Sequence, residues 1–267
     1  MFNSSSDPFI KALKSFGYNT VRLPKADTAP LQVFSRNGNN LERLGALIKL
    51  LTPGSTIQPP AITADVPTAN INGKRTGEIK IGLGLSILGN IIGAMGGSTL
   101  GLETQYQQAK SAVFEFSGVT EDRLDVIDLD QYLGDADINP ASVFVSKLLE
   151  SDQLYVTTAV LKSSKFTFEG TQSSGIGVDV KVPVIQQVVG GNVSVKTAAG
   201  SQSKLTYEGK IPLVFAFQAV QIFYDNGRYT AFKPVEDVTT KALSKVDAKT
   251  AGMDLLMTTD TFVRIID

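Results

Sequence analysis

The chain has 267 residues, enough for one large domain or two small ones, and 42% of them are hydrophobic while 19% are charged. Its formal net charge of -1 argues against a nucleic-acid-binding protein, because recognition of phosphates needs a clustered excess of basic side chains. The absence of cysteine and histidine excludes disulfides, a thiolate nucleophile and a Cys/His metal site, so we expect a non-enzymatic chain with no catalytic residue, metal or cofactor.

The first predicted element is a helix that begins at Asp7-Pro8, an N-cap followed by proline, and ends at Gly17. The residues before it resemble neither a secretory signal nor a myristoylation site, and we expect neither. The helix has an apolar face and a basic flank, formed by Phe9, Leu13 and Phe16 and by Lys11 and Lys14. Such a helix either packs on a core or contacts an anionic lipid surface.

The next sixty residues alternate between short apolar runs and polar connections. Residues 21–34 contain apolar runs broken by Pro24 and Pro30, a pattern typical of strands or extended edges. After Asn40, leucine and isoleucine recur at helical spacing, which predicts a helix that ends at Pro53-Gly54. The positions on its apolar face are Leu41, Leu44, Leu47, Ile48 and Leu51. Residues 59–76 are polar and contain proline, so we expect a connecting region there.

A long stretch over residues 77–116 has the strongest pattern in the chain. From Glu78 to Ile87, every second residue is isoleucine or leucine, which predicts a strand with one apolar face. That face consists of Ile79, Ile81, Leu83, Leu85 and Ile87. No charged residue occurs between Lys80 and Glu103, and Gly96-Gly97 is a plausible hairpin turn before the chain returns.

Three interpretations of this stretch remain open. Its length would allow a transmembrane helix, but its glycines oppose one, since each costs about 1 kcal/mol in a helix. It could be the half-buried strand of a soluble sheet. It could also be a strand that faces lipid in another state, for which ~9–11 residues suffice if many copies close into a ring. A nucleotide-binding loop at Gly82-Leu83-Gly84 is disfavoured, because the third glycine and the following helix are missing.

Two helices are predicted in the middle of the chain. Thr120 is a candidate N-cap for a helix over residues 121–133, although a short strand at residues 125–129 is an alternative. Asn139-Pro140 begins a second helix that ends near Leu149. Strands are predicted after it, over residues 154–161 and 165–168.

A second long strand–turn–strand stretch covers residues 165–207. Its apolar face consists of Ile176, Val178, Val180, Val182 and Val184, and the opposite face contains Gly, Asp, Lys and Pro. Gly190-Gly191 is the predicted turn. A third hairpin follows over residues 210–233, with a buried first strand and the turn signal Asp225-Asn226-Gly227.

The last thirty residues change in character. Residues 236–252 are rich in Thr, Lys, Ala, Asp and Ser, which is typical of an exposed linker. An apolar tail follows, and we expect it to dock on the rest of the protein. Its apolar residues are Leu255, Leu256, Met257, Phe262, Val263, Ile265 and Ile266.

Taken together, these features resemble the gasdermin family, and more closely its short bacterial members. The resemblance rests on the N-terminal helix, on residues 21–24, on the two long stretches, on the strand over residues 210–220 and on the short apolar tail. It implies an α+β fold, a twisted and mostly antiparallel central sheet with surrounding helices. It also implies a mechanism in which a protease cuts the linker, the tail leaves, both stretches insert as hairpins, and many copies form a large pore that kills the cell in defence against phage.

The resemblance divides the chain into a pore-forming domain (1–238), a protease-sensitive linker (239–252) and an autoinhibitory peptide (253–267). The implied partners are an activating protease, anionic membrane lipids and further copies of the chain, with no nucleic acid. The implied location is the cytoplasm for the intact chain and the inner membrane after cleavage. Leu243 is our candidate for the residue before the cut, as the apolar side chain centred in a polar linker, while Lys241, Lys245 and Lys249 fit a trypsin-like rather than a caspase-like enzyme.

The chain departs from the family in one respect. Bacterial gasdermins commonly carry an acylated cysteine near the N-terminus, whereas this chain has residues 3–6, Asn-Ser-Ser-Ser, and no cysteine. The resemblance therefore does not extend to acylation. The competing interpretation is a soluble β-rich lipid-binding or structural protein that uses the same apolar faces without refolding.

Overall fold

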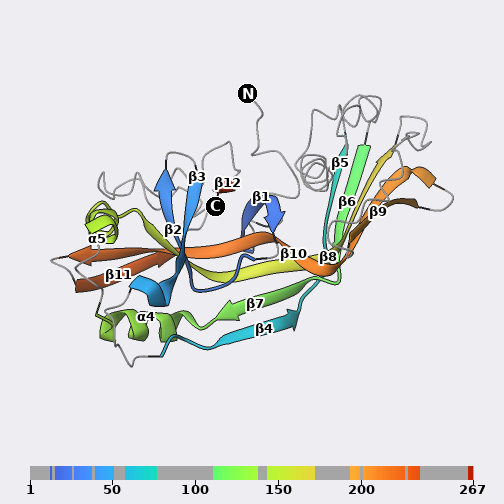
Figure 1. The fold of residues 1–267 in the computed structure, drawn as a ribbon. Coiled ribbons are helices and arrows are strands. Elements are labelled where there is room, and N and C mark those ends of the chain that lie inside the picture. Colours follow the sequence, from blue (N-terminus) through green and yellow to red (C-terminus); the bar gives the residue numbers. More distant parts are fainter. Residues whose placement is uncertain are drawn as a thin grey trace.

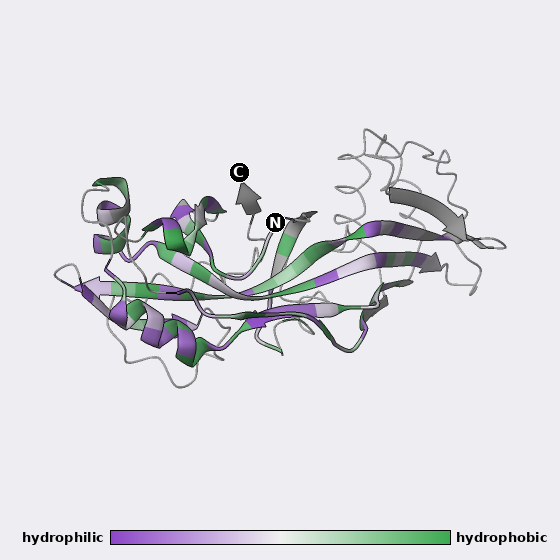
Figure 2. Ribbon diagram, turned by 60° about the horizontal axis from the view of Figure 1, so that its bottom comes forward, coloured by the Kyte–Doolittle hydropathy of each residue, from purple (hydrophilic) through white to green (hydrophobic). Residues whose placement is uncertain are grey.

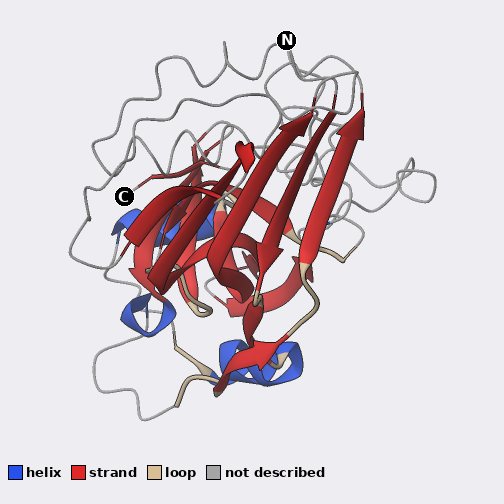
Figure 3. Cartoon of the chain, turned by 90° about the vertical axis from the view of Figure 1, so that its right-hand side faces the viewer, coloured by secondary structure: helices blue, strands red, loops and turns tan. Residues whose placement is uncertain are grey.

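The computed structural model describes residues 13, 16–25, 27–37, 40–50, 58–76, 111–137, 143–171, 193–198, 201–225, 228–234 and 264–266. Within these residues the protein is one twisted, mostly antiparallel sheet of 12 strands with helices around it (Figures 1 and 3). The predicted α+β fold is confirmed.

The elements in chain order are β1 (Asn19–Lys25), β2 (Gln32–Asn37), β3 (Asn40–Ala46), the 3-10 helix η2 (Leu47–Leu50), β4 (Ile62–Pro67), β5 (Ile71–Thr76), β6 (Ser111–Ser117), β7 (Thr120–Leu124), α4 (Val126–Asp135), α5 (Val143–Glu150), β8 (Leu154–Thr171), β9 (Val193–Ala198), β10 (Ser201–Asp225), β11 (Arg228–Pro234) and β12 (Arg264–Ile266).

Two long central strands, β8 and β10, pair antiparallel and organise the sheet. The main strand order is β1-β10-β8-β2-β3-β12, and β11 pairs with the end of β10. The predicted third hairpin is confirmed, because Asp225 pairs with Arg228 across a two-residue loop. The two predicted strands over residues 154–168 form one strand, β8, whose first eight residues are all buried.

Both faces of the β8–β10 pair are covered, which explains the long hydrophobic runs of these strands, green in Figure 2. On one face Leu129 and Leu133 of α4 pack in a cluster with Val156 of β8. On the other face Tyr155 of β8 belongs to a second cluster with Phe217 of β10. Neighbouring residues of a strand point to opposite faces, so a strand buried on both sides loses the alternation that normally identifies it.

The helix predicted over residues 41–51 is wrong. Residues 40–46 form β3, and only residues 47–50 turn, as a 3-10 helix. β3 pairs antiparallel with β2, and Asn37 pairs with Asn40 across a two-residue loop. The two loop residues are Gly38-Asn39, and a two-residue loop of glycine and asparagine favours such a hairpin. The leucine spacing fits a strand followed by a tight turn as well as it fits a helix.

Two further expectations are corrected in the region around β7. The segment predicted as a connection, residues 59–76, contains the strands β4 and β5. The helix predicted from Glu121 begins only at Val126, because residues 120–124 form β7 between β4 and β8. Its N-cap is Asp125, whose side chain accepts a hydrogen bond of 2.8 Å from the N–H of Ile127. Helix α5, Val143–Glu150, overlaps most of the second predicted helix.

Candidate functional site

Both flanks of the first long stretch and the first flank of the second meet at one end of the sheet. The strands there lie in the order β5-β6-β8-β10-β9, seen on the right of Figure 1. Thr76 at the end of β5 pairs with Ser111 at the start of β6, and Ser111 pairs with Thr171 at the end of β8. The chain therefore leaves this sheet end after Thr76 and after Thr171, on two strands that both pair with β6.

The ten apolar residues predicted to insert lie outside the described residues. These are Ile79, Ile81, Leu83, Leu85 and Ile87 of the first stretch and Ile176, Val178, Val180, Val182 and Val184 of the second. The structure thus places the strands that carry the two stretches, and the roles of these ten side chains stay predictions.

The strand pairing is interrupted at one level of the sheet, although β8 and β10 each continue through it. In β10, Glu208 pairs with Lys165 and Leu213 pairs with Ser163, so four residues lie opposite one. At the same level β4 passes into β5 through residues 68–70, and β6 passes into β7 through residues 118–119. We call this line the bend. The arm comprises β5, β6, β9 and residues 165–171 and 201–208, and the body comprises the other described residues. Figure 1 shows the arm turning away from the body.

Hydrogen bonds connect the two sides of the bend. The buried Ser163 hydroxyl, on the body, lies 2.7 Å from the carbonyl oxygen of Ser117, the last residue of β6. The same hydroxyl lies 2.8 Å from the carbonyl oxygen of Lys165, a second acceptor for its single hydrogen, and its oxygen accepts the N–H of Lys165 at 3.0 Å. In the neighbouring connection the Asn70 side chain accepts the N–H of Gly118 at 3.0 Å. Gly118 has φ +60°, a left-handed conformation that favours glycine.

Aromatic rings also cross the bend. Phe116 of the arm stacks on Phe215 of the body, with ring centroids 3.9 Å apart and an interplanar angle of 10°. Phe215 lies at a β-bulge, because Val214 pairs with Lys162 while Ala216 pairs with the next residue, Leu161. A bulge redirects a side chain from the regular alternation of a strand. Phe215 is fully buried, so the stack is part of the interior.

A charged cluster cross-links three strands on the body side of the bend. The Lys162 ammonium of β8 lies 2.7 Å from a carboxylate oxygen of Asp122 in β7 and 2.9 Å from one of Asp65 in β4. The backbone N–H of Asp65 donates to Asp122 at 2.7 Å. Burial alone would lower the pKa of Lys162, but the hydrogen bonds and negative charges of the two aspartates raise it on balance. The cluster therefore keeps a charged lysine in the sheet.

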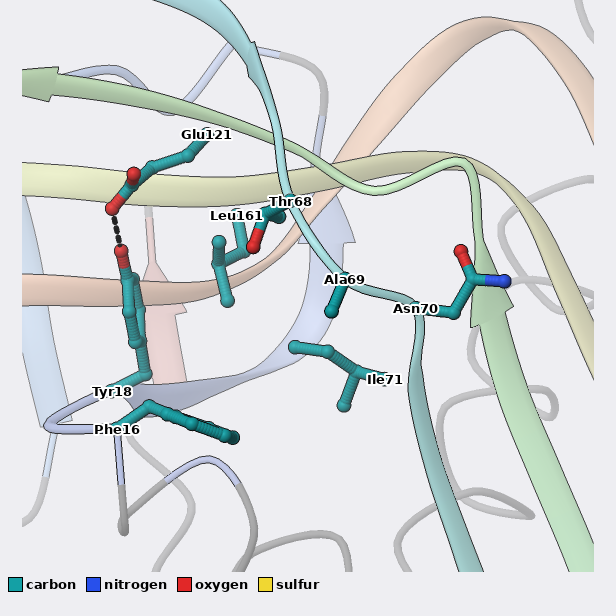
Figure 4. A pocket seen from close by; sticks show the side chains of 8 residues that line it. All are labelled: Phe16, Tyr18, Thr68, Ala69, Asn70, Ile71, Glu121 and Leu161. Atoms are coloured by element: carbon teal, nitrogen blue, oxygen red, sulfur yellow. Dashed lines mark hydrogen bonds between the residues drawn. The ribbon is translucent and has the colours of Figure 1, made fainter.

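A cavity of about 430 Å³ lies against the bend (Figure 4). Its lining residues are Phe16, Tyr18, Thr68, Ala69, Asn70, Ile71, Glu121 and Leu161. Tyr18 donates a hydrogen bond from its hydroxyl to the Glu121 carboxylate, drawn as the dashed line in Figure 4. Arg123 also donates to Glu121, at 3.1 Å. The walls are mostly apolar, and the carboxylate is already engaged by two donors.

The end of the N-terminal helix borders this cavity. Gly17 has φ 75°, and the N–H of Tyr18 donates to the carbonyl oxygen of Leu13 at 2.9 Å, the bond that closes a Schellman motif. The helix stop predicted at Gly17 is therefore confirmed. Leu13 is fully buried, whereas Phe16 is 67% exposed. Of the predicted lipid-contacting residues, Phe9, Lys11 and Lys14 lie outside the described residues.

We expect alkaline pH to destabilise the fold partly through Tyr18. Burial, and then the hydrogen bond and negative charge of Glu121, raise the pKa of Tyr18 above its ordinary value of 10.0. The unfolded chain would ionise this phenol near pH 10 while the folded chain keeps it protonated, so the free energy of unfolding falls as the pH rises above 10.0. Urea unfolding of Tyr18→Phe should show a smaller alkaline loss than the unmodified chain, and an equal loss would contradict this role.

The C-terminal segment joins the opposite part of the sheet as an edge strand. β12 pairs parallel with β3, and Ile265 lies opposite Leu41. β12 also lies close to β1, so it sits between β3 and β1. Leu243 and the other apolar tail residues, Leu255, Leu256, Met257, Phe262 and Val263, lie outside the described residues, and the side chains of Ile265 and Ile266 are not described.

No helix among the described residues has the length and hydrophobicity needed to cross a membrane. The model of the Bacterial Gasdermin Family matches residues 21–228. A "Gasdermin bGSDM" from a Desulfuromonadales bacterium is 52% identical over 261 residues, 97% of each chain. Another, from Lysobacter enzymogenes, is 38% identical over 86% of this chain and 85% of its own. Among solved structures, a bacterial gasdermin from Bradyrhizobium tropiciagri is similar with a TM-score of 0.56 over 86% of this chain and 91% of its own, at 13% identity, a likeness of fold alone.

Proposed function

This chain belongs to the bacterial gasdermin family, and on that premise we propose that it is an autoinhibited pore-forming protein. Proteolytic removal of the tail releases residues 77–110 and 172–192 to insert as two β-hairpins per subunit, and many copies close into a membrane pore. One observation carries the proposal: the two ends of the first stretch and the start of the second lie at a single end of the sheet, on the three consecutively paired strands β5, β6 and β8.

The register at that end suits strand extension. Thr76, Ser111 and Thr171 lie side by side in one hydrogen-bonded row. If the strands grow past this row, the two strands of the first stretch and the outgoing strand of the second are neighbours in the order β5-β6-β8. The second stretch returns at β9, which lies beyond β10 and begins at Val193 opposite Gly209, so its returning strand has to form anew beside β10. A membrane strand needs ~9–11 residues with one apolar face, which is the pattern of both stretches. The outermost strands would leave unpaired backbone groups in lipid, so insertion requires a closed ring of copies.

The tail restrains the chain by docking as a tethered peptide. A tethered segment binds at an effective concentration in the millimolar range. Cleavage between residues 239 and 252 replaces this by the concentration of free peptide, so the docked state loses several kcal/mol by dilution. The pairing of β12 with β3 supplies a docking mode for the peptide 253–267. Leu243 remains our candidate for the residue before the cut.

The membrane partner we propose is an anionic bilayer, reached from the cytoplasm at the inner membrane. Lys11 and Lys14 flank the apolar face of the N-terminal helix, and each basic residue near an anionic surface contributes about 1 kcal/mol. Pore formation there would kill the cell, which is the outcome expected of an antiphage device triggered by a protease.

The test is truncation after Leu243. We expect the truncated chain to release dye from anionic liposomes and to be toxic when expressed, while the full-length chain does neither. The same truncated chain should leak neutral liposomes less, which separates lipid preference from insertion. If neither chain leaks liposomes or harms cells, the competing interpretation, a soluble β-rich lipid-binding or structural protein, replaces this one.

A further inference from the structure

The bend separates two parts of the sheet that are each internally stiff. On the body side Lys162, Asp65 and Asp122 tie β8, β4 and β7 together. On the arm side β6 and β8 pair without interruption from Ser111 to Ser117, and the rings of Phe116 and Phe166 lie 4.6 Å apart. The interruptions lie between these two parts. A relative motion of body and arm would therefore concentrate at the bend, where few ladder hydrogen bonds resist it.

Several described contacts cross the bend where β6 meets the body, and two of them involve buried residues of the body; an exposed one joins the Asn70 side-chain amide, as donor, to the Glu115 carboxylate at 3.2 Å. Ser163 of the body binds the carbonyl oxygen of Ser117. Phe215 of the body, redirected by its bulge, stacks on Phe116 of the arm. Both residues of the body are buried, so these contacts are made in the interior and are lost together if the arm swings.

We propose that the bend is a hinge, that the Ser163–Ser117 hydrogen bond and the Phe116–Phe215 stack are its latch, and that the latch opens when the arm carries the two stretches into the bilayer. This rests on the proposed function, because insertion supplies the force that opens the latch. Opening straightens the sheet and moves the tip of the arm away from helix α4, from which it turns in Figure 1.

The latch is tested with matched variants of two buried hydroxyls on β8. Ser163→Ala removes the hydrogen bond across the bend. Thr157→Val removes a hydrogen bond of 3.1 Å from a fully buried hydroxyl to the carbonyl oxygen of Gln32, with both partners in the body. In the chain truncated after Leu243, Ser163→Ala should speed dye release about fivefold, the factor that corresponds to a hydrogen bond of about 1 kcal/mol. Thr157→Val should leave the rate unchanged. Equal acceleration by both variants would overturn the latch.

The hinge itself is tested by a distance. Because the chain has no cysteine, Val113→Cys on the arm and Gln131→Cys on α4 introduce the only two sites for spin labels. We expect the Val113–Gln131 distance to lengthen when the truncated chain inserts into anionic liposomes. An unchanged distance in a chain that releases dye would overturn the hinge and leave the proposed function intact.

The spin-labelled full-length chain shows whether the hinge exists independently of the pore-forming function. In solution, Ser163→Ala should broaden the distance distribution toward longer values, and Thr157→Val should not. If this holds while the truncated chain never releases dye, the hinge stands and the pore-forming function fails. If Ser163→Ala leaves the distance distribution unchanged, a second variant decides. Phe116→Leu removes the stack but keeps an apolar side chain, and it should broaden the distribution. If neither variant broadens the distribution, the hinge is overturned.

Discussion

Val180→Lys should abolish dye release by the chain truncated after Leu243 while the full-length variant still folds. Val180 lies at the centre of the apolar face of the second stretch. A lysine on the lipid face of a membrane strand costs ~2–4 kcal/mol near the bilayer midplane. Every subunit of a ring carries this cost, so the penalty multiplies with the number of copies and assembly in the membrane fails.

The neighbouring Lys181 provides the matched control. It lies on the opposite, polar face of the same stretch, which would line the water-filled side. Lys181→Gln should therefore leave dye release close to that of the unmodified truncated chain. Release assays on liposomes, with far-UV circular dichroism of the full-length variants to verify folding, decide the matter. If Val180→Lys releases dye at the unmodified rate, this face does not contact lipid.

Ile265→Pro should activate the full-length chain without any cleavage. Ile265 is the central residue of the three that pair with β3. Proline lacks an N–H and fixes φ, so it is poorly tolerated within a strand that must hydrogen bond to its neighbour. The docked state of the tail then loses its ladder, and the tethered peptide no longer restrains the sheet.

Dye release by the uncut variant is the measurement, and Ile265→Val is the control because valine preserves the strand preference. We expect the proline variant to approach the activity of the truncated chain and the valine variant to stay silent. An uncut Ile265→Pro chain that stays silent would show that the restraint resides in another part of the tail.

The sequence predicted those parts of the fold that carry a local signal. The hairpin of β10 and β11 was identified from a buried run and an Asn-Gly turn, and the helix stop from Gly17. The strands β4, β5 and β7 were missed because they carry no such local signal. β4 is exposed along almost its whole length, so it has no apolar alternation, and its strand conformation depends on pairing with β7.

In the candidate site, too, some features could be predicted from the sequence and others could not. The apolar faces of the two stretches follow from their period of two, but their convergence does not, because it depends on the register of strands distant in sequence. Ser163 carried no signal, since its role requires Ser117 across the sheet. The bulge at Phe215 could not be predicted either. Val214, Phe215 and Ala216 form one apolar run, and this run looks the same whichever of the three residues is the unpaired residue of the bulge.

The parallel pairing of β12 with β3 has a consequence for biosynthesis. β3 emerges early from the ribosome, and β12 emerges after all of the other described strands. Their contact closes the longest loop in the sheet, which makes it a late step of folding. If the tail restrains the protein as proposed, each newly made molecule passes through an interval in which the other strands have formed and this restraint is not yet in place. Translation that stalls before β12 would turn this interval into an unintended trigger.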